Sequence, residues 1–219
     1  MDLKMTMRLP KLIAFDLDYT LWDFWVDTHI EPPLHQDPKT GVVYDNSTGY
    51  YGREGPSTVE FYGDVPGILK NLRDAGVTIA ACSRTSAIKL AMEALKLIRI
   101  PNGTEASTEN STNTPTENNG DVSQSWTTTT SPAVKFFDQL EIYPTDKTVH
   151  FKELHKKTGL PYSEMLFFDD ERRNRNVEKL GVTFILVPEG RGVDNKLFKD
   201  GLREWRKRHP EPTPSASDA

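Results

Sequence analysis

The stretch LIAFDLDYT, residues 12–20, joins a short apolar run to two aspartates and a threonine. Because side chains alternate along a strand, Asp16 and Asp18 are expected on the same side while Leu17 points away. Ligands of open parallel sheets bind at the carboxyl ends of the strands. A single Asp at such a place is usually a turn residue or a helix cap. The pair followed by Thr20 instead favours a functional site.

Four further apolar runs have strand character, and helical patterns lie between them. The segment 66–75 begins with a proline in its first turn and stops before Gly76, as helices commonly do. Residues 85–97 carry apolar side chains at helical spacing. This alternation predicts an α/β fold with a central parallel sheet covered on both faces, in one domain over residues 10–209. The expected strands are 12–17, 77–83, 140–143, 165–170 and 182–187.

Two stretches interrupt the alternation. Within residues 21–62, VVYDNSTGYY (42–51) predicts two short strands around a DNSTG turn, and hence a β-hairpin flap. From Pro101 to Pro132 the chain is mostly Ser, Thr, Asn, Pro and Gly, and Val122 and Trp126 are its only large apolar residues. Such a composition favours a disordered insertion and leaves the fold without a folded cap domain. The tail 210–219 is expected to be disordered as well.

Composition narrows the class of partner. The 27 Lys and Arg residues against 32 Asp and Glu give a net charge of -5, which offers no general attraction to nucleic acid or to an anionic membrane. A phosphate pocket must therefore be locally positive. Cys82 is the single cysteine, the first residues lack the apolar stretch of a signal peptide, and no run approaches the roughly 20 apolar residues that span a bilayer. These features favour a cytoplasmic or nuclear protein.

Two other expected strands end in polar residues whose side chains could act together with Asp16. One ends in Ser83, and another ends in Asp169 and Asp170. Magnesium usually takes one or two carboxylates together with water and phosphate, and Asp16 and Asp169 from neighbouring strand ends could supply them. Acids gathered at one end of a sheet repel each other unless a cation is present. The alternative is that Asp169 or Asp170 caps a helix that starts near Arg172.

Lys147 follows the expected third strand, just ahead of a helix that begins near His150. Most lysines are solvated surface residues, and that is the default for an isolated one. Its position after a strand end gives it a second interpretation, because an ammonium group there could neutralise phosphoryl oxygens and hold a nucleophile.

Four segments together resemble the motifs of the haloacid dehalogenase-like hydrolases: FDLDYT (15–20), the Ser83 that ends VTIAACS, Lys147, and FFDD (167–170). The match narrows further, since four longer segments look like the magnesium-dependent phosphatase-1 group of that superfamily. The resemblance covers roughly residues 10–200 without the low-complexity insertion, and it implies a three-layer Rossmann-like fold. The longer segments are LWDFWVDTHIEPP (21–33), CSRTS (82–86), EIYPTDK (141–147) and FFDDERRN (167–174).

The resemblance implies a role for each matching residue. Asp16 would be the nucleophile that forms an aspartyl-phosphate, and Asp18 the acid that protonates the leaving oxygen and later activates water. Ser83 and Lys147 would bind the transferring phosphoryl group. Thr20 would orient the motif. The residues that would supply further substrate or supporting contacts are Arg84 and Asn174.

The resemblance also implies a Mg²⁺ ion as cofactor. The ion would sit between the carboxylate of Asp16, the main-chain carbonyl of Asp18 and the carboxylate of Asp169, with Asp170 close by. Members of the superfamily that hydrolyse their phospho-aspartate typically have an acid at the position of Asp18, whereas members with a long-lived phospho-aspartate lack it.

The neighbouring aromatic residues have two interpretations. Trp22, Phe24 and Trp25 could form the packed base of the flap or a platform for substrate, with neither favoured. Cys82 is expected to be a small core residue, since ACSRTS is not a convincing phosphate loop around a thiol.

Without a folded cap the site should be open. The resemblance implies activity on phosphotyrosine-like compounds and on sugar phosphates such as phosphorylated fructosamines, in a monomer or weak dimer. A bulky phosphoprotein would also fit. The rival interpretations are a phosphotransferase or mutase of the same fold and a non-catalytic binding protein that retains it.

Overall fold

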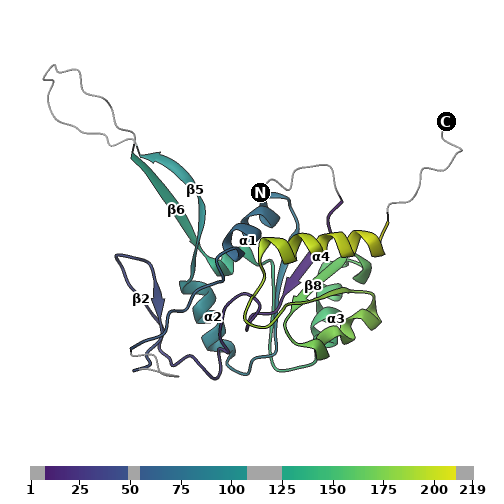
Figure 1. Ribbon diagram of the computed structural model, residues 1–219, viewed down its shortest axis with the longest axis horizontal. Coiled ribbons are helices and arrows are strands. Elements are labelled where there is room, and N and C mark those ends of the chain that lie inside the picture. Colours follow the sequence, from purple (N-terminus) through teal and green to yellow (C-terminus); the bar gives the residue numbers. More distant parts are fainter. Residues whose placement is uncertain (1–7, 49–54, 108–124, 211–219) are drawn as a thin grey trace, which may run out of the picture.

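The computed structural model describes residues 8–48, 55–107 and 125–210. Its centre is a five-stranded parallel sheet in the order β7-β4-β1-β8-β9 (Figure 1). The α/β fold with a central parallel sheet, as predicted, is confirmed. The strands are β1 (Leu12–Phe15), β4 (Thr78–Ser83), β7 (Gln139–Ile142), β8 (Met165–Asp169) and β9 (Thr183–Leu186).

The central strand β1 pairs in parallel register with a neighbour on each side. Phe15 pairs with Ala81 of β4 on one side and with Phe168 of β8 on the other. The next residue continues this ladder, because the amide of Asp16 donates to the carbonyl of Phe168 at 2.9 Å. The residues that follow β1 and end β8 therefore lie side by side at one edge of the sheet.

Helices cover both faces of the sheet. Ile13 and Phe15 of β1 pack toward α1 (Val65–Asp74), α2 (Ile88–Leu97) and α4 (Asn195–Arg208). The alternate residues Leu12 and Ala14 pack toward α3 (Lys147–Thr158) and the 3-10 helix η3 (Arg172–Leu180). Two short 3-10 turns, η1 (Ala133–Phe136) and η2 (Tyr162–Glu164), join elements. Within the described ranges, no helix combines the length and apolar character needed to cross a membrane.

One glycine lets a helix approach the sheet closely. A Cβ at Gly201 of α4 would lie 2.6 Å from Cζ of Phe168. Since real Cβ atoms essentially never come that near, the glycine is what allows α4 to rest on β8. The packing holds the strand that ends in Asp169.

The flap is a hairpin, but its turn differs from the predicted one. Strands β2 (His35–Gln36) and β3 (Val43–Tyr44) pair antiparallel around residues 37–42. The side chain of Asp37 accepts the amides of Lys39 and Thr40, and Gly41 has a φ of 75°. These features close the turn before DNSTG, whereas the expected turn lay at DNSTG. The second expected strand, at Tyr50 and Tyr51, lies outside the described residues.

The insertion 101–132 is not disordered at its two ends, which corrects the prediction. Strands β5 (Arg99–Ser107) and β6 (Ser125–Pro132) form an antiparallel ribbon that projects from the body of the molecule (Figure 1). The ribbon is rooted in the core, because Ile100 and Ala133 are fully buried and the amide of Ala133 donates to the carbonyl of Ile98 at 2.8 Å. Backbone pairing from such a root needs few apolar side chains, and threonine favours strands. Residues 108–124 and the tail 211–219 lie outside the described residues.

Candidate active site

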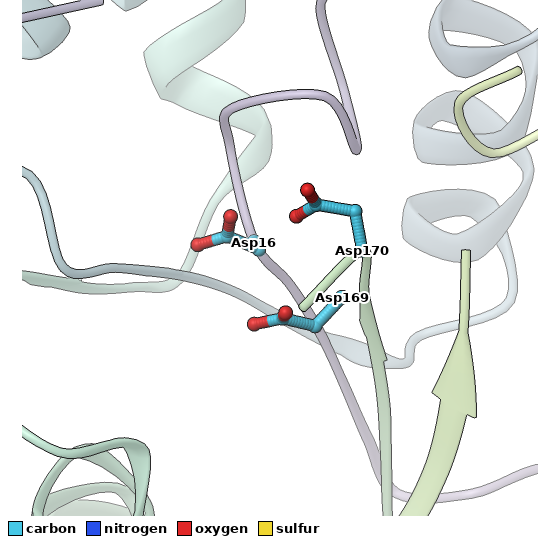
Figure 2. A group of neighbouring side chains, drawn as sticks. All are labelled: Asp16, Asp169 and Asp170. Carbon is cyan, nitrogen blue, oxygen red and sulfur yellow. The ribbon is translucent and has the colours of Figure 1, made fainter. Parts of the chain in front are cut away.

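Three carboxylates meet at the carboxyl ends of two adjacent strands. Asp16 directly follows β1, Asp169 is the last residue of β8, and Asp170 comes next. One oxygen from each lies within 4.8 Å of the other two, and the three groups point into the same space (Figure 2). Asp16 and Asp169 are buried, and Asp170 is partly exposed. The predicted juxtaposition of the first two acids is thus present.

Lys147 lies among these acids rather than on the surface. It is the first residue of α3, whose preceding Asp146 caps the helix by accepting the amide of Thr148 at 2.8 Å. Its side chain is 1% exposed, and its ammonium group donates to Asp16 and to the carbonyl of Cys82. The same nitrogen lies 3.1 Å from Oδ2 of Asp169. Helix α3 therefore begins at Lys147, earlier than the sequence indicates.

The cluster holds one cationic side chain among three carboxyl groups. Burial disfavours a charged lysine, but the charges of Asp16 and Asp169 outweigh it and raise the pKa of Lys147 above its ordinary value. Burial raises the pKa of Asp16 well above its usual range, against the opposing effect of Lys147. Burial and then the charge of Asp169 raise the pKa of Asp170 to about 7. One ammonium group faces three carboxylates that are costly to ionise together.

The residues fit a hard divalent cation. Oδ1 of Asp170 is buried and has no hydrogen-bond partner among the residues that the structure describes. A buried polar atom left without a partner costs free energy, and a cation beside it would remove that cost. Magnesium prefers oxygen ligands and uses one or two carboxylates, which this cluster offers.

Asn174 holds one of these carboxylates in place. Its amide nitrogen lies 3.0 and 2.9 Å from the two oxygens of Asp169, and Arg84 donates to its amide oxygen at 3.3 Å. Oδ1 of Asp169 also accepts the amide of Glu171 at 2.7 Å. The capping interpretation is therefore wrong for Asp169, because this bond goes to Glu171, which itself holds the N-cap position of η3. The second oxygen of Asp169 faces Lys147.

Asp18 lies in the same pocket but has different partners. Its Oδ1 accepts the indole N–H of Trp22 at 2.7 Å and the amide of Val26 at 3.2 Å. Burial raises the pKa of Asp18 to about 6, and these two hydrogen bonds oppose the rise. From the sequence, Trp22 is expected only in the packed base of the flap or in a substrate platform. No sequence pattern points to this contact, because it depends on the packing of the Trp22 ring against Phe24 and Phe61.

A pocket of about 310 Å³ opens above these side chains. It contains most of the residues singled out from the sequence. The exceptions are Thr20, Asp169 and Asn174, which are buried and do not line the pocket. The carbonyl of Thr20 accepts the amide of Val193 at 3.0 Å. The predicted residues that line the pocket are Asp16, Asp18, Ser83, Arg84, Lys147 and Asp170, and those that the sequence did not identify as site residues are Asp27, Thr28, Thr85, Glu171 and Arg173.

The aromatic residues of the flap divide between the two interpretations. Trp22 is fully buried and stacks on Phe24 and Phe61, with ring centroids 5.0 and 6.0 Å away. Trp25 instead lines the pocket and is 47% exposed. Trp22 and Phe24 form the packed base, whereas Trp25 lines the pocket with its ring close to Tyr19 and His29.

Comparison with known proteins agrees with this geometry. The acid phosphatase family model matches residues 8–208. Magnesium-dependent phosphatase 1 of Homo sapiens is 39% identical over 210 residues, which cover 95% of this chain and 94% of that protein. A HAD-like hydrolase superfamily protein of Schizosaccharomyces pombe is 41% identical over 182 residues, covering 82% of this chain and 86% of that protein.

A solved structure supports the fold alone. The N-terminal part of a Bacteroides fragilis protein, which contains a phosphatase domain and is complexed with Mg, aligns with a TM-score of 0.50 at 17% identity and covers 87% of this chain. This chain spans 39% of the length of that one. The sheet and the acids at its strand ends therefore define a hydrolase of the haloacid dehalogenase-like type. The chain belongs to the acid phosphatase family and, within it, to the magnesium-dependent phosphatase-1 group. The predicted family, phosphatase class and magnesium cofactor are thereby confirmed.

Proposed function

We propose that this phosphatase transfers the phosphoryl group of a monoester to Asp16 and then hydrolyses the aspartyl-phosphate. The observation that carries the proposal is the contact of Lys147 with both Asp16 and Asp169 at the floor of the pocket. A carboxylate that attacks an anionic phosphate must be held in place and must have its charge offset, and Lys147 does both. Unaided phosphate monoesters hydrolyse so slowly that enzymes accelerate them by up to about 10²¹-fold.

In the first half of the reaction, a carboxylate oxygen of Asp16 attacks phosphorus while the bond to the leaving oxygen breaks. The proton of Asp18 passes to that oxygen, so the product leaves as a neutral alcohol or phenol. Ser83, which ends β4 and lines the pocket, and Lys147 supply donors for the phosphoryl oxygens. These groups fix the in-line geometry that phosphoryl transfer requires.

In the second half, a water molecule attacks the phosphorus of phospho-Asp16. The now anionic Asp18 takes the proton of that water, and the bond between phosphorus and Asp16 breaks. Inorganic phosphate leaves, and Asp18 is protonated again for the next cycle. One acid thus serves both halves, which is consistent with its place in the pocket.

The bound Mg²⁺ would offset the negative charge that the phosphoryl group brings. The residues that would hold it are Asp16 and Asp169 through their carboxylates and Asp18 through its main-chain carbonyl, with Asp170 beside them. The clustering of the three carboxylates supports this set.

The substrate class that the pocket favours is a phosphate on an aromatic ring, as in phosphotyrosine. Trp25 is about half exposed, and Arg84 and Arg173 line the same pocket. An aromatic leaving group can stack on an exposed indole, whereas a small alkyl group gains less there. Sugar and fructosamine phosphates remain the second class, which the two arginines could bind through hydroxyl groups.

Phosphate release by Asp16→Asn tests the mechanism. Mg²⁺-dependent release from a panel of aryl and sugar phosphates should fall by about 10³-fold or more, because the nucleophile is removed. Rapid acid quenching of the wild type should trap one phosphate on the peptide that contains Asp16. Asp23→Asn is the matched control, since Asp23 is exposed and bonds Tyr62 outside the pocket. Full activity in Asp16→Asn would refute the nucleophile, and transfer to added sugars that exceeds phosphate release would favour a phosphotransferase.

A further inference from the structure

We propose that Trp22 is a positioning residue for Asp18, whose indole N–H fixes which carboxyl oxygen carries the catalytic proton. The proposal rests on the acid and base role assigned to Asp18 above. It gives a buried side chain of the flap base a specific part in the reaction.

Both hydrogen bonds to the Asp18 side chain go to the same carboxyl oxygen. The indole N–H of Trp22 and the amide of Val26 both donate to Oδ1, at 2.7 and 3.2 Å. An oxygen that accepts two N–H groups uses its lone pairs as an acceptor and is a poor place for a proton. When the carboxyl group is protonated, the proton therefore resides on Oδ2. The catalytic proton then has a defined position, as proton transfer to a leaving oxygen requires.

The indole is held so that it cannot turn away. Trp22 is fully buried, and its ring stacks nearly parallel on Phe24 and Phe61, with interplanar angles of 8° and 16°. Backbone bridges also join Trp22 to Asp18 and to Phe61. The direction of the N–H is thus set by packing before substrate binds, and it needs no rearrangement during the reaction.

A buried indole N–H needs some partner in any protein, so the choice of partner is what matters. Trp205 is also fully buried, and its N–H donates to the backbone carbonyl of Ser163 at 2.9 Å. That contact satisfies the indole and nothing more. Trp22 instead donates to a carboxyl group that lines the pocket. Trp22 therefore positions a carboxyl group of the pocket, whereas the bond of Trp205 only gives a buried N–H a partner.

Loss of the N–H should affect substrates unequally. With one donor removed, Asp18 can rotate, and its proton can occupy either oxygen. A poor leaving group such as phenolate depends on receiving the proton, whereas a good one such as para-nitrophenolate depends on it much less. A purely structural change would slow both substrates by the same factor.

The experiment compares kcat/KM of Trp22→Phe and wild type on phenyl phosphate and para-nitrophenyl phosphate with Mg²⁺. Phenylalanine keeps an aromatic ring for stacking but lacks the N–H and is smaller than the indole. The expected result is a loss on phenyl phosphate about 10-fold larger than the loss on para-nitrophenyl phosphate. The ratio of the two losses is independent of the fraction of folded protein. Phe61→Leu, which disturbs the same stack and keeps the N–H, should change both rates equally.

Asp18→Ala separates the inference from the proposed function. If Asp18→Ala does not lower kcat/KM more on phenyl phosphate than on para-nitrophenyl phosphate, the acid role of Asp18 is wrong. If Asp18→Ala shows the unequal loss and Trp22→Phe shows an equal one, the role of Trp22 alone is overturned. In the double variant, the ratio of the kcat/KM losses on the two substrates should equal that of Asp18→Ala alone, because the indole acts only through that carboxyl group.

Discussion

The ammonium nitrogen of Lys147 lies 3.1 Å from Oδ2 of Asp169 and also donates to Asp16, so one cation joins the acids at the ends of two adjacent strands. The first turn of α3 is thereby tied to β1 and β8. Because all three side chains are buried, this contact connects the stability of the fold to the chemistry of the pocket.

Replacing Lys147 by methionine should destabilise the fold by about 3–5 kcal/mol in the absence of divalent cations, since it leaves buried carboxylates without a counter-charge. Millimolar Mg²⁺ should restore part of the loss by binding the same acids. Urea unfolding with and without MgCl₂ measures both effects. Lys70→Met is the control, because its ion pair with Asp74 is exposed and should be worth under about 1 kcal/mol. A loss no larger than that of the control would contradict the prediction.

Replacing Asn174 by alanine should weaken Mg²⁺ binding by about 10–100-fold, which is typical when a hydrogen bond to a metal ligand is removed. Asn174 contacts both oxygens of Asp169, so its loss frees the orientation of that carboxylate. Calorimetric titration of the purified protein with MgCl₂ measures the affinity without relying on activity. Asn176→Ala is the matched control on the same 3-10 helix, because Asn176 bonds Asp146 outside the acid cluster. Equal affinities for both variants would contradict the role of Asn174.

Replacing Trp25 by alanine should lower kcat/KM for phosphotyrosine about fivefold, as expected for the loss of roughly 1 kcal/mol of stacking. A small alkyl phosphate should be affected much less, because it has no ring to place on the indole. Steady-state kinetics on the two substrates give the ratio. Ile88→Ala removes another exposed apolar side chain that does not line the pocket, and it should leave the ratio unchanged. An equal effect of Trp25→Ala on both substrates would argue against an aromatic leaving group.

His150 should make stability depend on pH between about 4 and 6.5. Burial, aided by the charges of Lys147 and Arg84, lowers the pKa of His150 to about 4 against the opposing effects of the Tyr143 carbonyl and Asp146. Below pH 6.5 the unfolded chain takes up a proton that the folded one does not, so the free energy of unfolding falls as pH falls through this window. The total contribution is about 2–3 kcal/mol.

The matching variant is His150→Gln, which retains a donor for the Tyr143 carbonyl. Its free energy of unfolding should decrease less than that of the wild type between pH 6.5 and 4. Carboxyl groups titrate in both proteins, so the difference between the two pH curves isolates the histidine. Parallel curves would show that His150 is protonated equally in both states.

The sequence predicts the sheet and the meeting of Asp16 with Asp169 because both depend on local patterns. Alternating apolar strands and helices define a parallel sheet, and acids at strand ends then meet at one edge. The place of Lys147 is harder to predict. A lysine in the first turn of a helix is usually exposed, and its burial here depends on tertiary contacts with Asp16, Asp169 and the Cys82 carbonyl.

Trp22 and the ribbon show two other limits of sequence patterns. Stacking between Trp22 and Phe61 joins residues that are far apart in the chain, and only that packing aims the indole at Asp18. The ribbon β5–β6 has a composition typical of disorder, but pairing begins at residues beside the core and continues outward through backbone hydrogen bonds. Composition alone does not reveal such a root.

The root of the ribbon also makes this position a natural point of insertion. The amide of Ala133 bonds the carbonyl of Ile98, so the core brings the two ends of the inserted segment together whatever lies between them. A longer or shorter segment then changes mainly the entropy of closing a loop, about 0.6 kcal/mol for each doubling of its length. The segment can thus change in length and composition across generations, or receive a reporter domain in the laboratory, with little effect on the sheet that holds the pocket.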